Sequence, residues 1–266
     1  MGEKTRSFKQ FEQTNKILSF KKVKKNSENM KNNKPIKLSP NSLNLYYECQ
    51  LCFWLDKRQG IRRPQPYPYA LNIAVDLLLK EEFDKYRKKR DFHPLLVAYN
   101  IPAKLFPNQK LIDEWRNNFK GIRYYDPILD ATLFGAVDDI LEFTDGKLAP
   151  LDYKSTGSTV PKVYDRFQLQ MDIYTYLLEK NGYKTVRKGC LAFYIVDKKN
   201  GFKDRLPFKK EIHIIDTDPS YVPGVFKEAV ALLKRETPPF HSPDCQYGHW
   251  LKSVSKIGFN PGGLTL

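Results

Sequence analysis

The spacing of hydrophobic residues changes along this chain from a helical period to an alternating one. Over residues 70–90, apolar side chains recur every three or four positions, which predicts a long amphipathic helix with an inward face of Leu71, Val75, Leu78, Leu79, Phe83 and Tyr86. An earlier helix is expected after Ser39, which can cap its start, with Pro40 in its first turn. Between residues 94 and 127 the pattern is weaker and interrupted by prolines, so no element is predicted there.

Alternation of apolar and polar residues begins at residue 132 and predicts an antiparallel hairpin. Its strands are residues 132–143 and 147–155. A helix follows over residues 164–183, where Asn181-Gly182 can end it, and the nearly continuous apolar run of residues 188–199 is typical of a central strand. Residues 208–217 predict a further strand and residues 219–236 a closing helix. This order predicts an α/β fold with a central mixed β-sheet flanked by α-helices.

The hairpin register decides which side chains share a face. A three-residue loop, Thr144-Asp145-Gly146, with Gly146 in the left-handed conformation, sets Asp138 opposite Asp152. One face then holds Asp138, Ile140, Asp152 and Lys154, and the other holds Val137, Leu141, Phe143, Leu151 and Tyr153. A two-residue loop would instead set Asp139 opposite Asp152. The three-residue loop is favoured because it sends only Asp139 toward the apolar side.

Two opposed carboxylates repel one another unless positive charge lies between them. Oxygen ligands without nearby cysteine or histidine suit a hard cation such as Mg²⁺ or Mn²⁺, which can also hold water and a phosphate oxygen. Lys154 lies on the same face as Asp152, where it could orient or deprotonate an attacking water and offset charge in the transition state. The hairpin therefore indicates phosphodiester chemistry.

Charge and composition support a nucleic-acid partner. The chain of 266 residues has a formal net charge of +15, which attracts polyanions. Residues 1–37 carry eleven basic and three acidic residues, net +8, in a composition typical of a flexible arm, which is either a solvated tail or a nucleic-acid-binding segment. A folded domain is expected over residues 38–252, with a tail over residues 253–266. No apolar run long enough for a membrane span and no secretory signal is present, so a cytoplasmic location is expected.

The motif series Gly135-Ala-Val-Asp138, Asp152-Tyr-Lys154 and Gln170-Met-Asp-Ile-Tyr174 resembles that of the PD-(D/E)XK nuclease superfamily, specifically its RecB-like branch. That branch includes CRISPR-associated exonucleases and the nuclease domains of recombination helicases. The resemblance implies a restriction-endonuclease-like core that cuts DNA with Mg²⁺ or Mn²⁺. It covers about Leu38 to Trp250.

Carried over residue by residue, the resemblance makes Asp138 and Asp152 metal ligands and Lys154 the catalytic lysine, with Gln170 and Tyr174 as the third motif. A purely structural Tyr174 is an equal alternative, because Phe167, Met171, Tyr174 and Leu178 form the core row of that helix. Gln168 replaces Gln170 if the helix is rotated. For the family's upstream metal ligand, Asp76 is chosen over Glu81 and Glu82 because Val75 and Leu77 flank it.

The four cysteines raise the question of a second metal. Relatives in this branch often hold an iron–sulfur cluster with one upstream cysteine and three near the C-terminus. Here only Cys49, Cys52 and Cys245 are suitably placed, Gly248 stands where another thiolate is expected, and Cys190 lies in an apolar strand, which argues against a cluster. A structural zinc site from Cys49, Cys52 and Cys245 with either His241 or His249 is chemically reasonable; the alternative is three buried cysteines without a metal.

These observations predict a metal-dependent deoxyribonuclease with exonuclease-like action on single-stranded DNA or duplex ends. The chain contains no GxxxxGK[ST] loop, so a helicase or another recombination or CRISPR component would be a separate partner. The main alternative is a non-catalytic nucleic-acid-binding protein that retains the fold, with Asp152 and Lys154 as a structural ion pair. A basic globular scaffold is a third interpretation, which explains the charge but not the hairpin.

Overall fold

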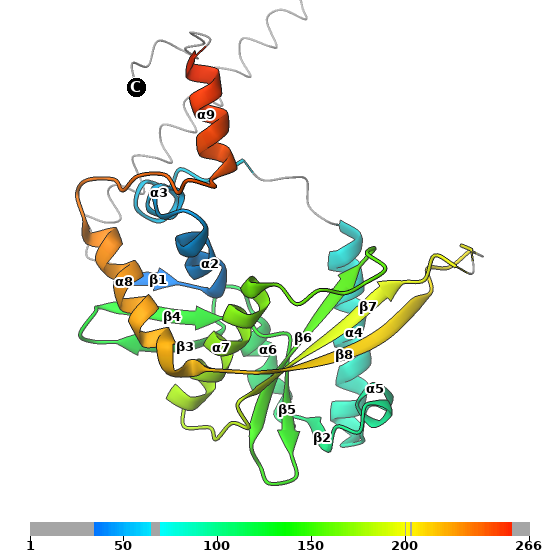
Figure 1. Ribbon diagram of the computed structural model, residues 1–266. Helices are drawn as coiled ribbons and strands as arrows, with labels where there is room; N and C mark the ends of the chain where they lie inside the picture. The colour runs from blue at the N-terminus through cyan, green and yellow to red at the C-terminus, as the bar shows by residue number, and fades with distance from the viewer. Residues whose placement is uncertain (1–34, 65–69, 200, 203, 257–266) are drawn as a thin grey trace, which may run out of the picture. The chain divides into compact units, whose positions relative to one another are not determined.

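The computed structural model of the protein describes residues 35–64, 70–199, 201–202 and 204–256 (Figure 1). Nearly all of the expected basic arm, and the last ten residues of the expected tail, lie outside the described residues. The chain divides into two compact units. The first comprises Met1–Ile36, Ser42–Pro66 and Glu228–Leu266, and the second comprises Lys37–Asn41 and Tyr67–Lys227.

The second unit is built on a five-stranded sheet with the order β2-β5-β6-β7-β8. Its strands are β2 (Ala103–Leu105), β5 (Asp139–Phe143), β6 (Leu148–Thr156), β7 (Lys188–Val196) and β8 (Phe208–Asp216). Strands β6 and β7 are parallel, and the other neighbours are antiparallel. A smaller sheet has the order β1-β4-β3, from β1 (Ile36–Leu38), β3 (Ile122–Asp126) and β4 (Ala131–Gly135). The expected mixed α/β architecture is therefore confirmed.

Two helices cover opposite faces of the five-stranded sheet. The ring of Phe83 in α4 (Ala70–Lys89) packs on Tyr153 of β6, with ring centroids 4.7 Å apart. The next residue, Lys154, points to the other face, where it meets Gln170 of α7 (Asp165–Lys180). Among its described residues this unit also contains α5 (Pro94–Ala98), α6 (Gln109–Arg116) and a 3₁₀ turn (Pro219–Tyr221). The core between α4 and the sheet includes Val75, Leu79, Leu141, Leu151 and Ala192.

Two predictions from the pattern are wrong in detail. Residues 132–143 were expected as one strand, but they form β4 and β5, which belong to different sheets, because the chain leaves its ladder at Gly135 and resumes pairing at Asp139. Leu71 and Leu78 were expected on the inner face of α4, yet they are 62% and 64% exposed. The buried row of α4 instead runs through Val75, Leu79, Phe83 and Arg87, and the arginine extends it because ion pairs satisfy its charge.

The first unit is helical in its described part. It contains most of α2 (Pro40–Glu48), then α3 (Gln50–Trp54), a π-helical turn (Leu55–Gln59) and α9 (Gln246–Lys256). Helix α8 (Val222–Lys234), like α2, crosses the boundary between the units. Among the described residues, no helix combines the length and the apolar character that a membrane crossing requires.

Candidate active site

The hairpin of β5 and β6 forms in the register that sets Asp138 opposite Asp152. Asp139 pairs with Leu151 across the two strands. The loop closes with the N–H of Phe143 donating to the carbonyl of Lys147 and the N–H of Gly146 donating to that of Phe143, each at 2.9 Å. Gly146 has a φ of +75°, as the three-residue loop requires. The predicted loop and register are confirmed.

The two opposed carboxylates each face one lysine. The side chain of Asp152 is 3% exposed and forms an ion pair with Lys154. That of Asp138 is 20% exposed, accepts a hydrogen bond from the backbone N–H of Tyr153 at 3.1 Å, and lies 3.0 Å from Nζ of Lys80. Two ammonium groups therefore offset the repulsion between the carboxylates.

Asp76 reaches the same cluster from α4. Its Oδ2 accepts a hydrogen bond of 2.7 Å from Nζ of Lys80, one helical turn later, so Lys80 bridges Asp76 and Asp138. Burial, and then the charge of Asp138, raise the pKa of Asp76. Burial lowers the pKa of Lys80, but the two aspartates outweigh it and the net shift is upward. Lys80 was not singled out from the sequence; its spacing of four residues from Asp76 was the available signal.

The carboxylate oxygens of Asp138 and Asp152 have the capacity to bind a further cation. Burial, and then the charge of Asp138, raise the pKa of Asp152 to about 7, although Lys154 opposes the shift. Apart from the ion pair with Lys154, the buried Oδ2 of Asp152 accepts no hydrogen bond from the described residues. A group of carboxylate oxygens with unused acceptor capacity fits a hard divalent cation such as Mg²⁺ or Mn²⁺.

A chain of hydrogen bonds from α7 positions the lysine. Nζ of Lys154 donates to Oε1 of Gln170 at 3.2 Å, Nε2 of Gln170 donates to the hydroxyl of Tyr174 at 2.8 Å, and that hydroxyl donates to the carbonyl of Ala136 at 2.6 Å. Gly135 makes room for the ring, because a Cβ there would lie 2.5 Å from Cε1 of Tyr174. The three sequence motifs thus meet through one network.

Gln168 lies outside this network. Its amide donates to Oδ1 of Asp172 at 2.9 Å and to the carbonyl of Asp216 at 2.8 Å. Gln170 is therefore the glutamine beside Lys154. Phe167 also contributes, because its ring centroid lies 4.5 Å from Nζ of Lys154.

Asp139 lies in a buried ionic network behind the site. It is fully buried, and its carboxylate accepts hydrogen bonds from Arg87 at 2.6 and 2.7 Å, from Arg116 at 3.0 Å and from the hydroxyl of Tyr153 at 2.8 Å. Nε of Arg116 also donates to the carbonyl of Asp138 at 2.8 Å. The sequence pattern gave no reason for a charged residue on the apolar face at Asp139, because it does not reveal the ion pairs with Arg87 of α4 and Arg116 of α6. These arginines fix the backbone that presents Asp138.

A pocket of about 410 Å³ opens beside the carboxylate cluster. Its lining consists of Asn72, Ile73, Asp76, Leu79, Tyr153, Lys154 and Ser155. A second pocket of about 130 Å³ shares Asn72 and Ser155 with it, along the N-terminal half of α4 and the end of β6. Asp76 and Lys154 are therefore accessible to a ligand.

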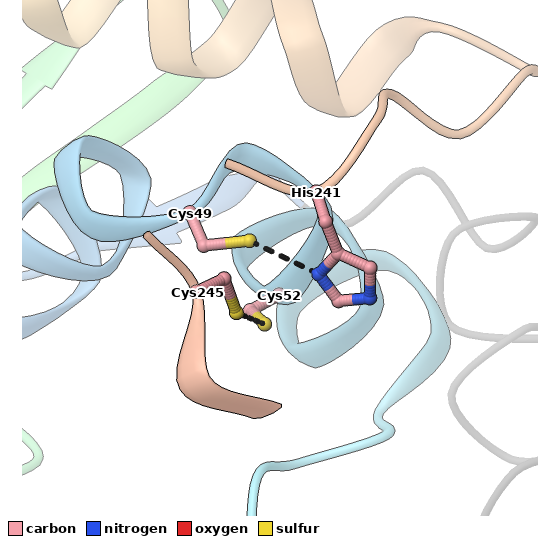
Figure 2. Close-up of side chains that lie close together, drawn as sticks. All are labelled: Cys49, Cys52, His241 and Cys245. Carbon is pink, nitrogen blue, oxygen red and sulfur yellow. Dashed lines mark hydrogen bonds between the residues drawn. The ribbon is translucent and has the colours of Figure 1, made fainter. Parts of the chain in front are cut away.

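The cysteines suggested for a second metal lie in the first unit. Cys49, Cys52 and Cys245 come together with His241 (Figure 2), whereas Nε2 of His249 lies 2.6 Å from the carbonyl of Pro243 and is not part of this group. Of the two histidines considered from sequence, His241 is the one brought to the thiols. Cys190 lies in β7 of the second unit.

Comparisons with known proteins identify the family of the chain. The family described as the PD-(D/E)XK nuclease superfamily matches residues 69–250. A solved structure titled "Crystal structure of SSO0001" is similar at 15% identity, covering 93% of this chain and 98% of that chain, with a TM-score of 0.36. No curated protein matches the chain.

Proposed function

Because the chain belongs to the PD-(D/E)XK nuclease superfamily, we propose that it hydrolyses phosphodiester bonds in DNA with Mg²⁺ or Mn²⁺, in an exonuclease-like manner. The observation that carries the proposal is the arrangement of Asp138, Asp152 and Lys154, tied to Gln170 and Tyr174 by hydrogen bonds. A purely structural hairpin would not need two opposed carboxylates beside an accessible pocket.

In this proposal Asp138 and Asp152 hold the cation, and Asp76 adds a third carboxylate through its proximity to Asp138. When bound, such a cation lowers the pKa of water and polarises a phosphate oxygen. Lys154 orients the attacking water and donates to the phosphate oxygen on which charge develops. Gln170 holds the ammonium of Lys154 in place, and Tyr174 in turn holds Gln170.

The choice of DNA rests on charge and on the RecB-like order of the motifs. A net charge of +15 attracts a polyanion of either kind, and the resemblance to RecB-like exonucleases favours DNA ends.

The test is cleavage of end-labelled DNA by the full chain. Single- and double-stranded DNA, each linear and circular, and a matched RNA are incubated with Mg²⁺, Mn²⁺ or EDTA. Lys154→Ala and Asp152→Asn are compared with Lys110→Ala, which removes an exposed lysine of α6 away from these contacts.

The expected result is metal-dependent loss of linear DNA, with circular DNA spared and Lys110→Ala as active as the unaltered chain. Both site variants should lose at least about a hundredfold of the rate. Cleavage of circular DNA would indicate an endonuclease instead. Tight binding without cleavage in either metal would favour the non-catalytic alternative, in which Asp152 and Lys154 form only a structural ion pair.

A further inference from the structure

Four side chains of types that commonly ligate metals converge in the first unit, independently of the candidate active site. Cys49 and Cys52 flank the start of α3, while His241 and Cys245 precede α9. One ligand atom from each lies within 4.8 Å of every other (Figure 2). The two halves of the group come from positions about 190 residues apart, since Cys52 and Cys245 are separated by 193.

The spacing of these atoms matches a single tetrahedral ion. Sγ of Cys52 and Sγ of Cys245 lie 3.7 Å apart, and Sγ of Cys49 lies 3.4 Å from Nδ1 of His241. With Zn–S bonds of about 2.3 Å and Zn–N bonds of about 2.0–2.1 Å, tetrahedral geometry separates two sulfurs by about 3.8 Å and a sulfur from a nitrogen by about 3.5 Å. These two distances therefore match a single zinc ion, and the remaining pairs of ligand atoms lie within 4.8 Å.

A disulfide and an iron–sulfur cluster both fit these cysteines less well than zinc does. A disulfide needs sulfurs about 2.05 Å apart, and all four cysteines are free. An iron–sulfur cluster places its own irons and sulfides between the thiolates, which leaves no room for ligand atoms at single-ion spacing. The usual four-thiolate ligand set of such a cluster would also need a fourth cysteine, and Cys190 belongs to a strand of the other unit.

The surroundings of the group are those of a metal-bound thiolate. The backbone N–H of Gly248 donates to Sγ of Cys245 at 3.4 Å, and Nη2 of Arg63 lies 3.9 Å from the same sulfur. Arg63 adds a positive charge beside a ligand set that would carry a net charge of about −1 with Zn²⁺. Such outer hydrogen bonds orient metal ligands and tune their basicity.

Gly248 explains why a histidine completes the set. A Cβ at this position would lie 2.9 Å from Cγ of His241, so any side chain would push the imidazole away. The absence of a side chain at the position where a fourth thiolate was expected therefore makes room for the fourth ligand.

We propose that Cys49, Cys52, His241 and Cys245 bind one Zn²⁺ that holds the two segments of the first unit together. Four protein ligands fill a tetrahedral shell and leave no open position, so the ion is structural and takes no part in hydrolysis. The cysteines are buried, and a shared cation would stabilise the close approach of their negatively charged thiolates.

The test measures the metal content of the full chain. Protein produced with added zinc, and separately with added iron, is dialysed and analysed for zinc, iron and acid-labile sulfide. About one zinc per chain is expected, with no labile sulfide. Replacement by Co²⁺ should give the visible absorption of tetrahedral cobalt with thiolate ligands. These readouts use the unaltered sequence, so they do not depend on a variant folding.

Variants then assign the ligands. Cys245→Ser and His241→Gln should lose the zinc, whereas His241→Cys should retain it by supplying a fourth thiolate. Cys190→Ser and His249→Gln are matched controls that should keep one zinc per chain. Absence of zinc after reconstitution, iron with labile sulfide, or zinc that is lost only with Asp138→Asn would each overturn the proposal. None of these results depends on nuclease activity.

Discussion

At the scale of single residues, the candidate site depends on a few hydrogen bonds that fix a lysine. The sequence left two alternatives for Tyr174, a core residue or a member of the third motif. In the structure its ring is buried against Gly135, and its hydroxyl connects Gln170 to Ala136. A core residue that also ends a hydrogen-bond chain cannot be recognised from helical spacing, because spacing reports the direction of a side chain and not its partners.

Tyr174→Phe is therefore expected to slow cleavage more than it weakens DNA binding. Loss of the hydroxyl frees Gln170 and leaves the carbonyl of Ala136 unsatisfied, which should cost about 1–2 kcal/mol of unfolding free energy. Single-turnover cleavage should fall about tenfold at unchanged DNA affinity. Tyr176→Phe is the control, since among the described residues the Tyr176 hydroxyl makes no hydrogen bond. Equal rates for the two variants would contradict a positioning role.

The buried carboxylate of Asp139 should matter far more to stability than its neighbour Asp84. Both pair with Arg87 and Arg116, but the side chain of Asp139 is 0% exposed and that of Asp84 is 29% exposed. Asp139→Ala leaves arginine charge without its buried partner and should lower the free energy of unfolding by about 3–5 kcal/mol. Asp84→Ala should lower the free energy of unfolding by only about 1 kcal/mol, because water can take the place of this partly exposed carboxylate. Urea unfolding of both variants provides the comparison, and similar losses would refute this difference.

At the scale of elements, the strands and helices with clear periods could be predicted, and those decided by tertiary contact could not. The hairpin register followed from loop length and from the direction of its side chains. The division between β4 and β5 did not, because it depends on pairing with strands of two different sheets, which the sequence of residues 132–143 alone does not record. The short elements α5, β2, α6 and β3 were missed because segments of three to eight residues are too short to show a clear periodic pattern.

Gly135 is the point at which β4 and α7 come into contact. Gly135→Ala should cost about 1–3 kcal/mol of unfolding free energy, since the new Cβ would overlap the ring of Tyr174. In a Tyr174→Leu background the same substitution should cost much less, because the ring is gone. A double-mutant cycle by thermal and urea unfolding measures this coupling. Additive effects would mean that the glycine is required for another reason.

His93 at the start of α5 should make stability depend on pH. Its Nδ1 accepts from the N–H of Leu95 at 3.2 Å, so Nδ1 carries no proton, and Nε2 faces Glu82 at 3.2 Å. Burial lowers the pKa of His93, and the charge of Lys210 lowers it further, while Glu82 and Asp139 oppose the shift. The buried ring is also stacked on Phe83, with centroids 3.8 Å apart.

The sign follows from which state binds the proton. The unfolded chain protonates His93 near pH 6.5 and the folded chain only at lower pH, so this residue's contribution is fully present above pH 6.5 and is lost as pH falls toward the lowered pKa. Asp152, whose pKa is raised, contributes the opposite trend, so the measurement is the slope of thermal stability against pH, between pH 7.5 and about 5, in the unaltered chain and in a His93 variant. His93→Gln should remove the loss of stability that this residue causes as the pH falls. An unaltered slope in His93→Gln would show that other groups cause it.

At the scale of the whole molecule, positive charge is distributed unevenly along the chain. Residues 1–34 carry ten basic and three acidic residues, a net charge of +7 out of the total of +15. In the proposed reaction the carboxylate cluster holds a cation next to a phosphate, whereas the charge of residues 1–34 attracts any polyanion. Affinity for DNA and the chemistry of cleavage should therefore be separable.

Removal of residues 1–34 tests that separation, since the first described strand, β1, begins only at Ile36. The shortened chain should bind DNA more weakly between about 50 and 200 mM salt, with a shallower dependence of log affinity on log salt, because each lost phosphate contact removes about 0.9 from the slope. At saturating DNA its single-turnover rate should match that of the full chain, since the residues assigned to the candidate site all lie between positions 76 and 174. Fluorescence anisotropy over a salt series measures the slope. An unchanged slope would mean that the basic segment is a solvated tail, and that the field around the second unit alone draws DNA to Asp138 and Asp152.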